Sequence, residues 1–249
     1  MRTAYQGVTN ILRFNWHFFA LAVGGTVAGL LVARWLGGSW WYLGLLVAAG
    51  VLLTTLASLV VSWYVYDYSG LYDLEWLDLP GEATELVNIH AGFDETSALL
   101  AERYPRARLR VLDFYDPALH TEVSIRRARR AYPPYPGTEG MHTAKVPLVS
   151  GSADAIFLLL AAHEIRDADE RVAFFRQLRR SLQPSGRIIV LEHLRDGANF
   201  LAYTLGFFHF YSRTTWLRTF DKAGLRIARE KKLTPFLTCF TLVADGTSP

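Results

Sequence analysis

Two pairs of adjacent histidine and carboxylate residues stand where predicted buried strands end. His163 and Glu164 follow one continuous apolar run, and Glu192 and His193 close the next. An imidazole beside carboxylates can move a proton to or from a bound ligand, and His163 is our first candidate for such a base. The alternatives are that His163 is a hydrogen-bonded wall residue and that the two glutamates pair with nearby arginines.

A second candidate site is a strand, a turn and a helix start between residues 86 and 104. The strand is apolar, Gly92 lies in the turn, and Asp94 or Thr96 can cap the helix. In open α/β sheets the backbone N–H groups of such a helix start bind nucleotide-like ligands. The stretch therefore predicts a cofactor pocket beside Gly92.

Alternating strand and helix signals position these residues. Apolar runs between turn residues predict strands at 86–89, 109–113, 154–161, 187–192, 225–233 and 238–244, with a weakly marked strand near 143–146. Helices are expected from about residue 97, and at 118–131, 167–182 and 214–223, the third with Asp167 and Glu170 as a start similar to a capping box.

The last two strands define the architecture. Only a short break at Pro235 separates them, and so short a connection cannot make a parallel crossover. The predicted fold class is therefore α/β, with a mostly parallel sheet that ends in a C-terminal antiparallel hairpin.

The first 70 residues have a different composition. Residues 18–36 are apolar or small except for Arg34, and residues 40–66 carry no charge, so each run reaches the roughly 20 residues that span a bilayer. We expect two antiparallel transmembrane helices at about 17–36 and 40–66, a membrane anchor over 1–70 and a second domain over 71–249. The alternative is a helical hairpin buried in a soluble core.

The flanking charges predict where the two domains lie. Arg2 and Arg13 precede the first span, which favours both chain ends in the cytoplasm and hence a multi-pass protein of the inner (cytoplasmic) membrane whose second domain faces the cytoplasm. Gly25 and Gly29 have a small-residue spacing that permits close helix contact, which indicates either a homo-oligomer through the transmembrane helices or packing of the hairpin on itself.

Charge and motif content limit the remaining classes of function. The net charge is only +3, so the basic face formed by Arg126, Arg127, Arg129 and Arg130 is expected to meet anionic lipid headgroups or solvent rather than nucleic acid. We find no Cys/His cluster with metal-ligand spacing and no serine nucleophile motif. The sequence gives no support to metal or acyl-transfer chemistry.

Three segments carry a family resemblance. GSADAIFLLLAAHEI and RVAFFRQLRRSLQPSGRIIVLEH lie within 151–193, and WLRTFDKAGLRI covers 216–227. They resemble the fourth strand, the following helix, the fifth strand, and the late helix and sixth strand of class I S-adenosylmethionine (SAM)-dependent methyltransferases. The resemblance covers 71–244 and implies a Rossmann-like seven-stranded sheet and SAM as the cofactor.

The glycine-rich loop departs from that family. The acidic-x-Gly-x-Gly-x-Gly pattern appears here as Asn88, His90, Gly92 and Asp94. Side chains enter space that glycine leaves open for the cofactor. The carboxylate expected at Asn88 to bind the cationic methionyl end of SAM is absent, although Asp94 could replace it.

The resemblance implies two sets of residues. Asp113 would accept the ribose hydroxyls, with Asp116 as the competing choice, Ala144 would line the adenine, and Ala161 and Ala162 would lie beside the methionine portion. The full cofactor-binding set is Asn88, His90, Ala91, Gly92, Asp94, Asp113, Phe114, Ala144, Ala161 and Ala162. The catalytic set is His163, Glu164, Glu192, His193, His209 and Tyr211. Simple packing of the alanines and a turn-capping role for Asp113 are the alternatives.

An aromatic segment suggests the methyl acceptor. Residues 199–211 hold six aromatic side chains where the family builds a substrate lid, which favours a lipophilic acceptor such as a quinone precursor, an isoprenoid or a lipid, with His209 and Tyr211 at its polar end. An ordinary packed helix is the alternative. Two other functions remain: a catalytically inactive membrane scaffold with this fold and, less favoured, a nicotinamide-dependent reductase.

Overall fold

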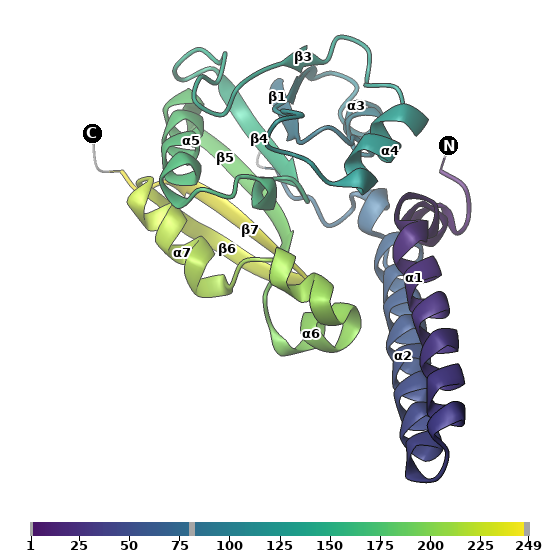
Figure 1. The fold of residues 1–249 in the computed structure, drawn as a ribbon. Coiled ribbons are helices and arrows are strands. Elements are labelled where there is room, and N and C mark those ends of the chain that lie inside the picture. The colour runs from purple at the N-terminus through teal and green to yellow at the C-terminus, as the bar shows by residue number, and fades with distance from the viewer. Residues whose placement is uncertain (1, 80–82, 247–249) are drawn as a thin grey trace.

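Seven strands form one mixed sheet in the computed structural model, which describes residues 2–79 and 83–246 (Figure 1). The strands are β1 (Glu85–His90), β2 (Arg108–Asp113), β3 (Glu139–Gly140), β4 (Ala153–Leu159), β5 (Leu182–His193), β6 (Leu225–Thr234) and β7 (Leu237–Ala244). Their order is β3-β2-β1-β4-β5-β7-β6. Strands β1 to β5 pair in parallel, and β7 pairs antiparallel with both β5 and β6. The predicted fold class, with its C-terminal antiparallel hairpin, is confirmed.

Burial on both faces explains why the central strands could be recognised. Along β5, Ile188 and Val190 pack into the core on one face, while Ile189 and Leu191 pack into the core on the other. A strand covered on both faces reads as a continuous apolar run.

The third strand was predicted in the wrong place. Strand β3 comprises only Glu139 and Gly140 and is exposed, whereas residues 143–146 form a turn that β3 precedes. A two-residue edge strand with exposed side chains has no apolar pattern from which it could be recognised.

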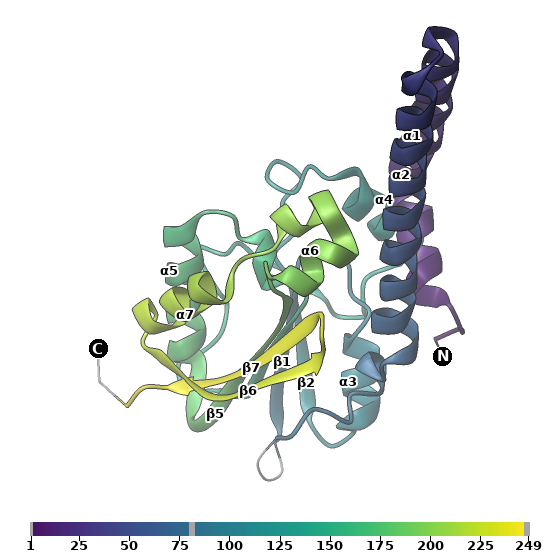
Figure 2. The ribbon, with the colours of Figure 1, turned by 90° about the horizontal axis from the view of Figure 1, so that it is seen from below.

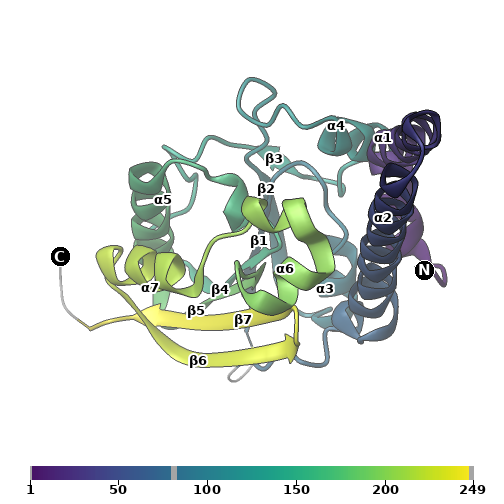
Figure 3. The same ribbon diagram turned by 60° about the horizontal axis from the view of Figure 1, so that its bottom comes forward.

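Helices cover each face of the sheet differently (Figure 3). Helices α5 (Ala168–Ser181) and α7 (Arg213–Lys222) cover one face with fully buried aromatic rings, among them Phe175 and Trp216. Helix α3 (Ser97–Arg103) and the segment that follows the hairpin cover the other face, through Leu100, Leu71 and Leu74. Helices α4 (Val123–Ala131) and α6 (Gly197–Tyr203) lie nearer the carboxyl ends of the strands.

Two helix starts differ from the prediction in detail. Helix α4 begins at Val123 rather than at residue 118, because Asp116 organises a turn there by accepting the backbone N–H of Ala118 with its carboxylate and that of His120 with its carbonyl. Asp167 caps α5 as expected, accepting from the backbone N–H groups of residues 169 and 170. Glu170 does not complete a capping box, since its carboxylate bonds the Thr143 hydroxyl instead.

The N-terminal segment forms two long helices, α1 (Gln6–Leu36) and α2 (Ser39–Trp63), and α2 continues into a π-helical turn over Tyr64–Tyr68. Helix α1 begins at Gln6, before the expected transmembrane span at about 17–36, and that span stays a prediction. The additional turns contain polar residues that interrupt the apolar run, and they lie against the α/β domain, where Tyr132 donates a hydrogen bond to Asn10 (2.9 Å).

Helix α1 is kinked at Asn15, whose backbone is not helical (φ −113°, ψ 15°). The Asn15 side chain donates to the carbonyl of Ile11, and Arg127 of α4 donates to the carbonyl of Phe14 (2.6 Å) and to His17. Side-chain insertion of this kind is a recognised cause of helix kinks. The kink separates the part of α1 that packs on the domain from the part that projects beyond it (Figure 2).

The projecting part of the hairpin has the properties of a membrane anchor. Both helices are long and apolar enough to cross a membrane, and only 6% and 0% of their most apolar windows are buried within the protein. A core helix of a soluble protein is mostly buried, so the exposed surface favours the membrane interpretation. The two helices are candidate spans on these grounds alone.

One carboxylate joins the two ends of the hairpin. Asp67, after α2, accepts the backbone N–H groups of Gly7 (2.6 Å) and Val8 (2.9 Å) in the first turn of α1, and Arg2 lies 4.0 Å from it. It satisfies N–H groups that no carbonyl within the helix can reach.

We expect Asp67→Ala to destabilise the detergent-solubilised protein by about 1–2 kcal/mol, the usual cost of losing a helix cap. This corresponds to a fall of roughly 2–8 °C in the unfolding midpoint. The matched control is Glu75→Ala, which removes an exposed carboxylate on the following segment. Equal midpoints for the two variants would contradict this role for Asp67.

Candidate functional site

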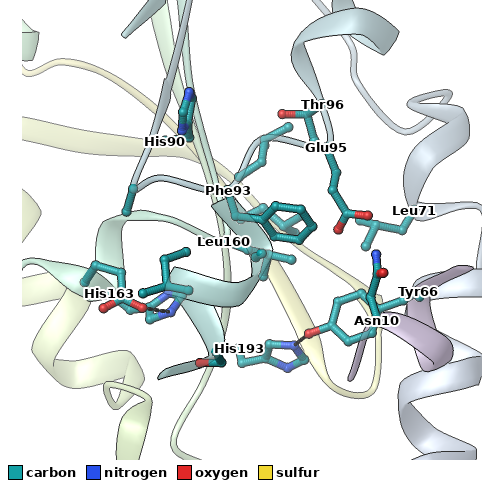
Figure 4. A pocket seen from close by; sticks show the side chains of 18 of the residues that line it. Asn10, Tyr66, Leu71, His90, Phe93, Glu95, Thr96, Leu160, His163 and His193 are labelled. Carbon is teal, nitrogen blue, oxygen red and sulfur yellow. Dashed lines mark hydrogen bonds and ion pairs between the residues drawn. The ribbon is translucent and has the colours of Figure 1, made fainter. Parts of the chain in front are cut away.

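A cavity of about 310 Å³ lies at the carboxyl ends of β1, β4 and β5 (Figure 4). One wall is the sheet edge, with Asn88, His163 and His193, and the opposite wall is the first part of α1, with Asn10 and Phe14. The volume is within the range of pockets for small ligands, about 300–1,000 Å³.

The structure brings seven of the predicted site residues to this cavity: Asn88, His90, Ala91, His163, Glu164, His193 and His209. Glu192 lies directly behind His163 and is fully buried. Phe114, Ala161 and Ala162 belong to the hydrophobic core, Tyr211 packs against that core, and Ala144 is an exposed turn residue. The alternative of plain packing therefore describes the placement of Ala161 and Ala162.

At the end of β1, Asn88 and Asp94 hold the helix start in place. The Asn88 amide donates to the hydroxyl of Ser97 (2.8 Å), and Asp94 Oδ1 accepts from the backbone N–H groups of Thr96 (3.0 Å) and Ser97 (2.9 Å). Asn88 Oδ1 and Asp94 Oδ2 are buried and have no partner among the described residues. Both are acceptors, so they suit a ligand that brings N–H donors.

His90 is a neutral donor beside them. Its Nδ1 accepts the backbone N–H of Gly92 (3.1 Å), and burial lowers its pKa despite the nearby carboxylates of Asp113 and Asp94. The remaining nitrogen, Nε2, is buried without a partner among the described residues. An unpartnered buried donor costs free energy, so a ligand that accepts from it is stabilised.

The space directly beside Gly92 is occupied. Gly92 has φ +94°, and an added Cβ would lie 2.9 Å from both Arg129 Nη1 and the ring of Tyr115. Arg129 pairs with Asp113 at 2.5 Å, and Asp113 also accepts the backbone N–H of Tyr115. The expected pocket beside Gly92 is therefore displaced, and the cavity reaches β1 at Asn88, His90 and Ala91 instead.

The side chains at the end of β1 fit the amino-acid end of SAM as they stand, whereas the ribose could bind only after Arg129 has moved. Asn88 and Asp94 would hold its amino-acid end, and Asp113 would hold the ribose once Arg129 has left. The Arg129 side chain is 36% exposed, so it can turn outward into solvent. When bound, SAM supplies a methyl group already activated by a sulfonium.

His163 is held between two carboxylates. Its Nδ1 lies 2.6 Å from Glu192 Oε2, and its Nε2 lies 3.3 Å from Glu164 Oε1. Burial alone would lower the pKa of His163, but the charge of Glu192 and the hydrogen bonds to Glu164 and Glu192 raise it to about 10. Burial would raise the pKa of Glu164, but hydrogen bonds to His163 and His209 hold it below its usual range. The isolated site therefore keeps His163 protonated at neutral pH.

His193 connects the hairpin to the sheet. Its Nδ1 lies 3.0 Å from both Asn199 Oδ1 and the carbonyl of Phe236, which are acceptors, so Nδ1 donates and Nε2 accepts from Tyr66 (2.9 Å). Burial lowers the pKa of His193 to about 4. His193 is therefore a neutral positioning residue in the wall rather than a proton carrier near pH 7.

Several cavity residues were not predicted from the sequence, namely Asn10, Phe14, Tyr66, Glu95 and Glu122. None of the five is the last residue of a strand or follows one directly, and only the polar residues in the first helix could have indicated that this helix faces protein. Arg2 pairs with Glu95 at 2.6 Å, which binds the N-terminal segment to the turn after β1.

Comparisons with known proteins indicate the class of enzyme. Residues 88–190 match the sequence model of the family described as "Methyltransferase domain". No curated protein matches the chain. Together with the solved structures below, the match to this family model supports a SAM-dependent methyltransferase with SAM as its cofactor.

Solved structures are similar in fold. A SAM-dependent methyltransferase from Aquifex aeolicus is 15% identical, with a TM-score of 0.52 over 71% of this chain and 93% of that one. Human N-acetylserotonin methyltransferase, in complex with SAM, is 15% identical, with a TM-score of 0.53 over 82% of this chain and 58% of that one. The mitomycin 7-O-methyltransferase MmcR is 18% identical, with a TM-score of 0.51 over 98% of this chain and 74% of that one.

Arg129 should compete with SAM for Asp113. We expect Arg129→Ala to bind SAM more tightly than the wild type in calorimetry, because no ion pair has to break, and Asp113→Ala to bind about tenfold or more weakly, because hydrogen bonds to a charged acceptor contribute about 1.5–3 kcal/mol. Arg126→Ala, an exposed arginine on the same helix, is the control. If SAM bound Arg129→Ala and Asp113→Ala as tightly as the wild type, Asp113 would not be the ribose ligand.

The protein should lose stability in acid through His193. The pKa of His193 is depressed from 6.5 to about 4 in the folded state. The stabilisation that neutral His193 gives the folded state is thus complete above pH 6.5. It is lost as pH falls toward 4, by up to about 1.4 kcal/mol per pH unit. We expect the unfolding midpoint to fall between pH 7 and pH 5, and to fall less in His193→Asn. The exposed His142→Ala should behave as the wild type, and equal slopes in all three proteins would refute the assignment.

Proposed function

We propose that the protein is a membrane-anchored SAM-dependent methyltransferase that methylates a lipophilic small molecule at the cytoplasmic surface of the inner membrane. The acceptor class is a quinone precursor, an isoprenoid or a lipid. One observation carries the proposal: the helix that forms a wall of the site cavity is the same helix that projects from the domain as an apolar candidate span. An acceptor dissolved in the bilayer would meet the site at the base of that helix.

The composition of the cavity supports an amphipathic acceptor. Phe14, Phe93 and Leu160 supply apolar walls, whereas His163, Glu164 and His209 form a polar end. A lipophilic body with one polar reacting group matches this division, since pockets orient ligands with a few polar groups in an apolar lining.

A second apolar surface lies next to the hairpin. Helix α6 contacts α2, and α6 with the 3-10 helix after it (Thr204–His209) exposes large apolar side chains. They are Phe200 (50% exposed), Leu201 (73%), Leu205 (82%) and Phe208 (60%). Such a patch beside a membrane span favours insertion into the interfacial region, so it extends the route by which a lipophilic acceptor would arrive.

Two observations favour the scaffold alternative. Arg129 occupies the carboxylate that a ribose would need, and the glycine-rich loop retains only Gly92. Calorimetry with SAM separates the two functions, because an inactive scaffold would show no binding at millimolar cofactor. The antiparallel β6–β7 pair argues against the reductase alternative.

The experiment that tests the function uses the full chain in vesicles of total membrane lipid, with SAM that carries a tritiated methyl group. We expect label in the organic extract and a product heavier by one methyl group in mass spectrometry. Ile11→Trp, which fills the cavity from the hairpin side, should reduce transfer by about tenfold or more while SAM binds as before, because misplacement of a reactant is costly.

Leu21→Trp is the matched control, because this residue is 70% exposed on the projecting part of the same helix. It should transfer the label as the wild type does. Transfer by Ile11→Trp at the wild-type rate, or label found only in water-soluble products, would contradict the proposal.

A further inference from the structure

Three side chains at the polar end of the cavity have metal-ligating donor atoms that face one another. His163 and Glu164 come from the short turn after β4, and His209 ends the 3-10 helix that follows α6. One donor atom from each lies within 4.8 Å of the other two, and each residue is partly buried. The three are brought together only by the fold, since 45 residues separate Glu164 from His209.

The spacing of these atoms agrees with tetrahedral coordination. Glu164 Oε1 lies 3.3 Å from His163 Nε2 and 3.3 Å from His209 Nε2. Zinc bonds to imidazole nitrogen and carboxylate oxygen of about 2.0–2.1 Å place neighbouring ligands of a tetrahedron about 3.3 Å apart. The three donor atoms would therefore need only small movements to bind a cation, and His163 would release the proton on Nε2 as it does so.

Each imidazole is supported from behind by a carboxylate. His163 Nδ1 lies 2.6 Å from Glu192 Oε2, and His209 Nδ1 lies 3.2 Å from Glu122 Oε1. In metal sites a carboxylate on the second ring nitrogen fixes the tautomer and leaves the first nitrogen free to ligate. Two such pairs on two candidate ligands are more than an ordinary salt-bridge network requires.

We propose that His163, Glu164 and His209 bind one divalent transition-metal ion, for which Zn²⁺ is the best match, with the fourth coordination position open to the cavity. Two imidazoles and one carboxylate suit Zn²⁺ better than Mg²⁺ or Ca²⁺, which prefer oxygen ligands alone. Three protein ligands with an open position are typical of catalytic rather than structural zinc. The inference does not depend on methyl transfer, because the side chains would bind the ion with or without an acceptor.

Arg166 is the internal competitor of the ion. Its Nη2 lies 2.6 Å from both ring nitrogens of His209 and 3.7 Å from Glu164 Oε2, and its side chain is 44% exposed. The guanidinium places a positive charge where the ion would add another, so it must turn outward when the ion binds.

The test uses the full chain in detergent, stripped with a chelator and titrated with Zn²⁺, with elemental analysis for stoichiometry. Co²⁺ provides an optical probe, since tetrahedral Co²⁺ absorbs visible light strongly. We expect one ion per chain, loss of binding in His209→Ala and Glu164→Gln, weakening by about 10- to 100-fold in Glu192→Gln, and tighter binding in Arg166→Ala.

His142→Ala, an exposed histidine outside the cavity, is the control and should bind as the wild type. Circular dichroism of each metal-free variant separates lost ligands from lost folding, and Arg166→Ala remains informative if Glu192→Gln does not fold. Binding that is unchanged in both His209→Ala and Glu164→Gln, or no ion retained by the wild type, would overturn the inference. Zinc binding without methyl transfer would leave it standing while removing the proposed function.

Discussion

The packing of the first turns of α1 against α4 is the interaction on which the site depends. Arg127 and Tyr132 of the α4 region donate hydrogen bonds to Phe14 and Asn10, on the N-terminal side of the Asn15 kink, and Asp67 caps the helix start. Without these bonds the carboxyl edge of the sheet would be open to solvent. The hairpin is therefore part of the cavity as well as a candidate anchor, and a change in its tilt would change the shape of the site.

The strands could be predicted because burial on both faces leaves a continuous apolar record, as at Ile156–Leu158, and the short break at Pro235 required the antiparallel end. The secondary-structure prediction failed where the local residue pattern does not reflect how a segment packs in the fold. Strand β3 has no buried residue, and the polar residues of α1 before Asn15 excluded that part from the predicted span, although Asn10 and Phe14 within it are buried.

For the site, strand ends indicated His163, Glu164, Glu192 and His193, because parallel strands place their carboxyl ends at one edge. No local sequence pattern indicated that Arg129 forms an ion pair with Asp113, since this pair depends on how α4 is oriented. Likewise, ligand-spacing rules consider one segment at a time, whereas His209 meets His163 and Glu164 only through the fold. The pairing of Tyr66 with His193 also required the hairpin to be placed on the sheet.

A common electrostatic arrangement runs through the cavity. Arg2 pairs with Glu95 and Arg166 with Glu164 in its wall, and Arg129 pairs with Asp113 outside the lining. A buried carboxylate without a cation is costly, so these arginines stabilise the ligand-free protein. In the proposed binding modes, the ribose of SAM would replace the guanidinium of Arg129, and a metal ion would replace that of Arg166. The affinity for either ligand therefore includes the cost of breaking an ion pair, and removing the arginine should tighten binding even as it destabilises the free protein.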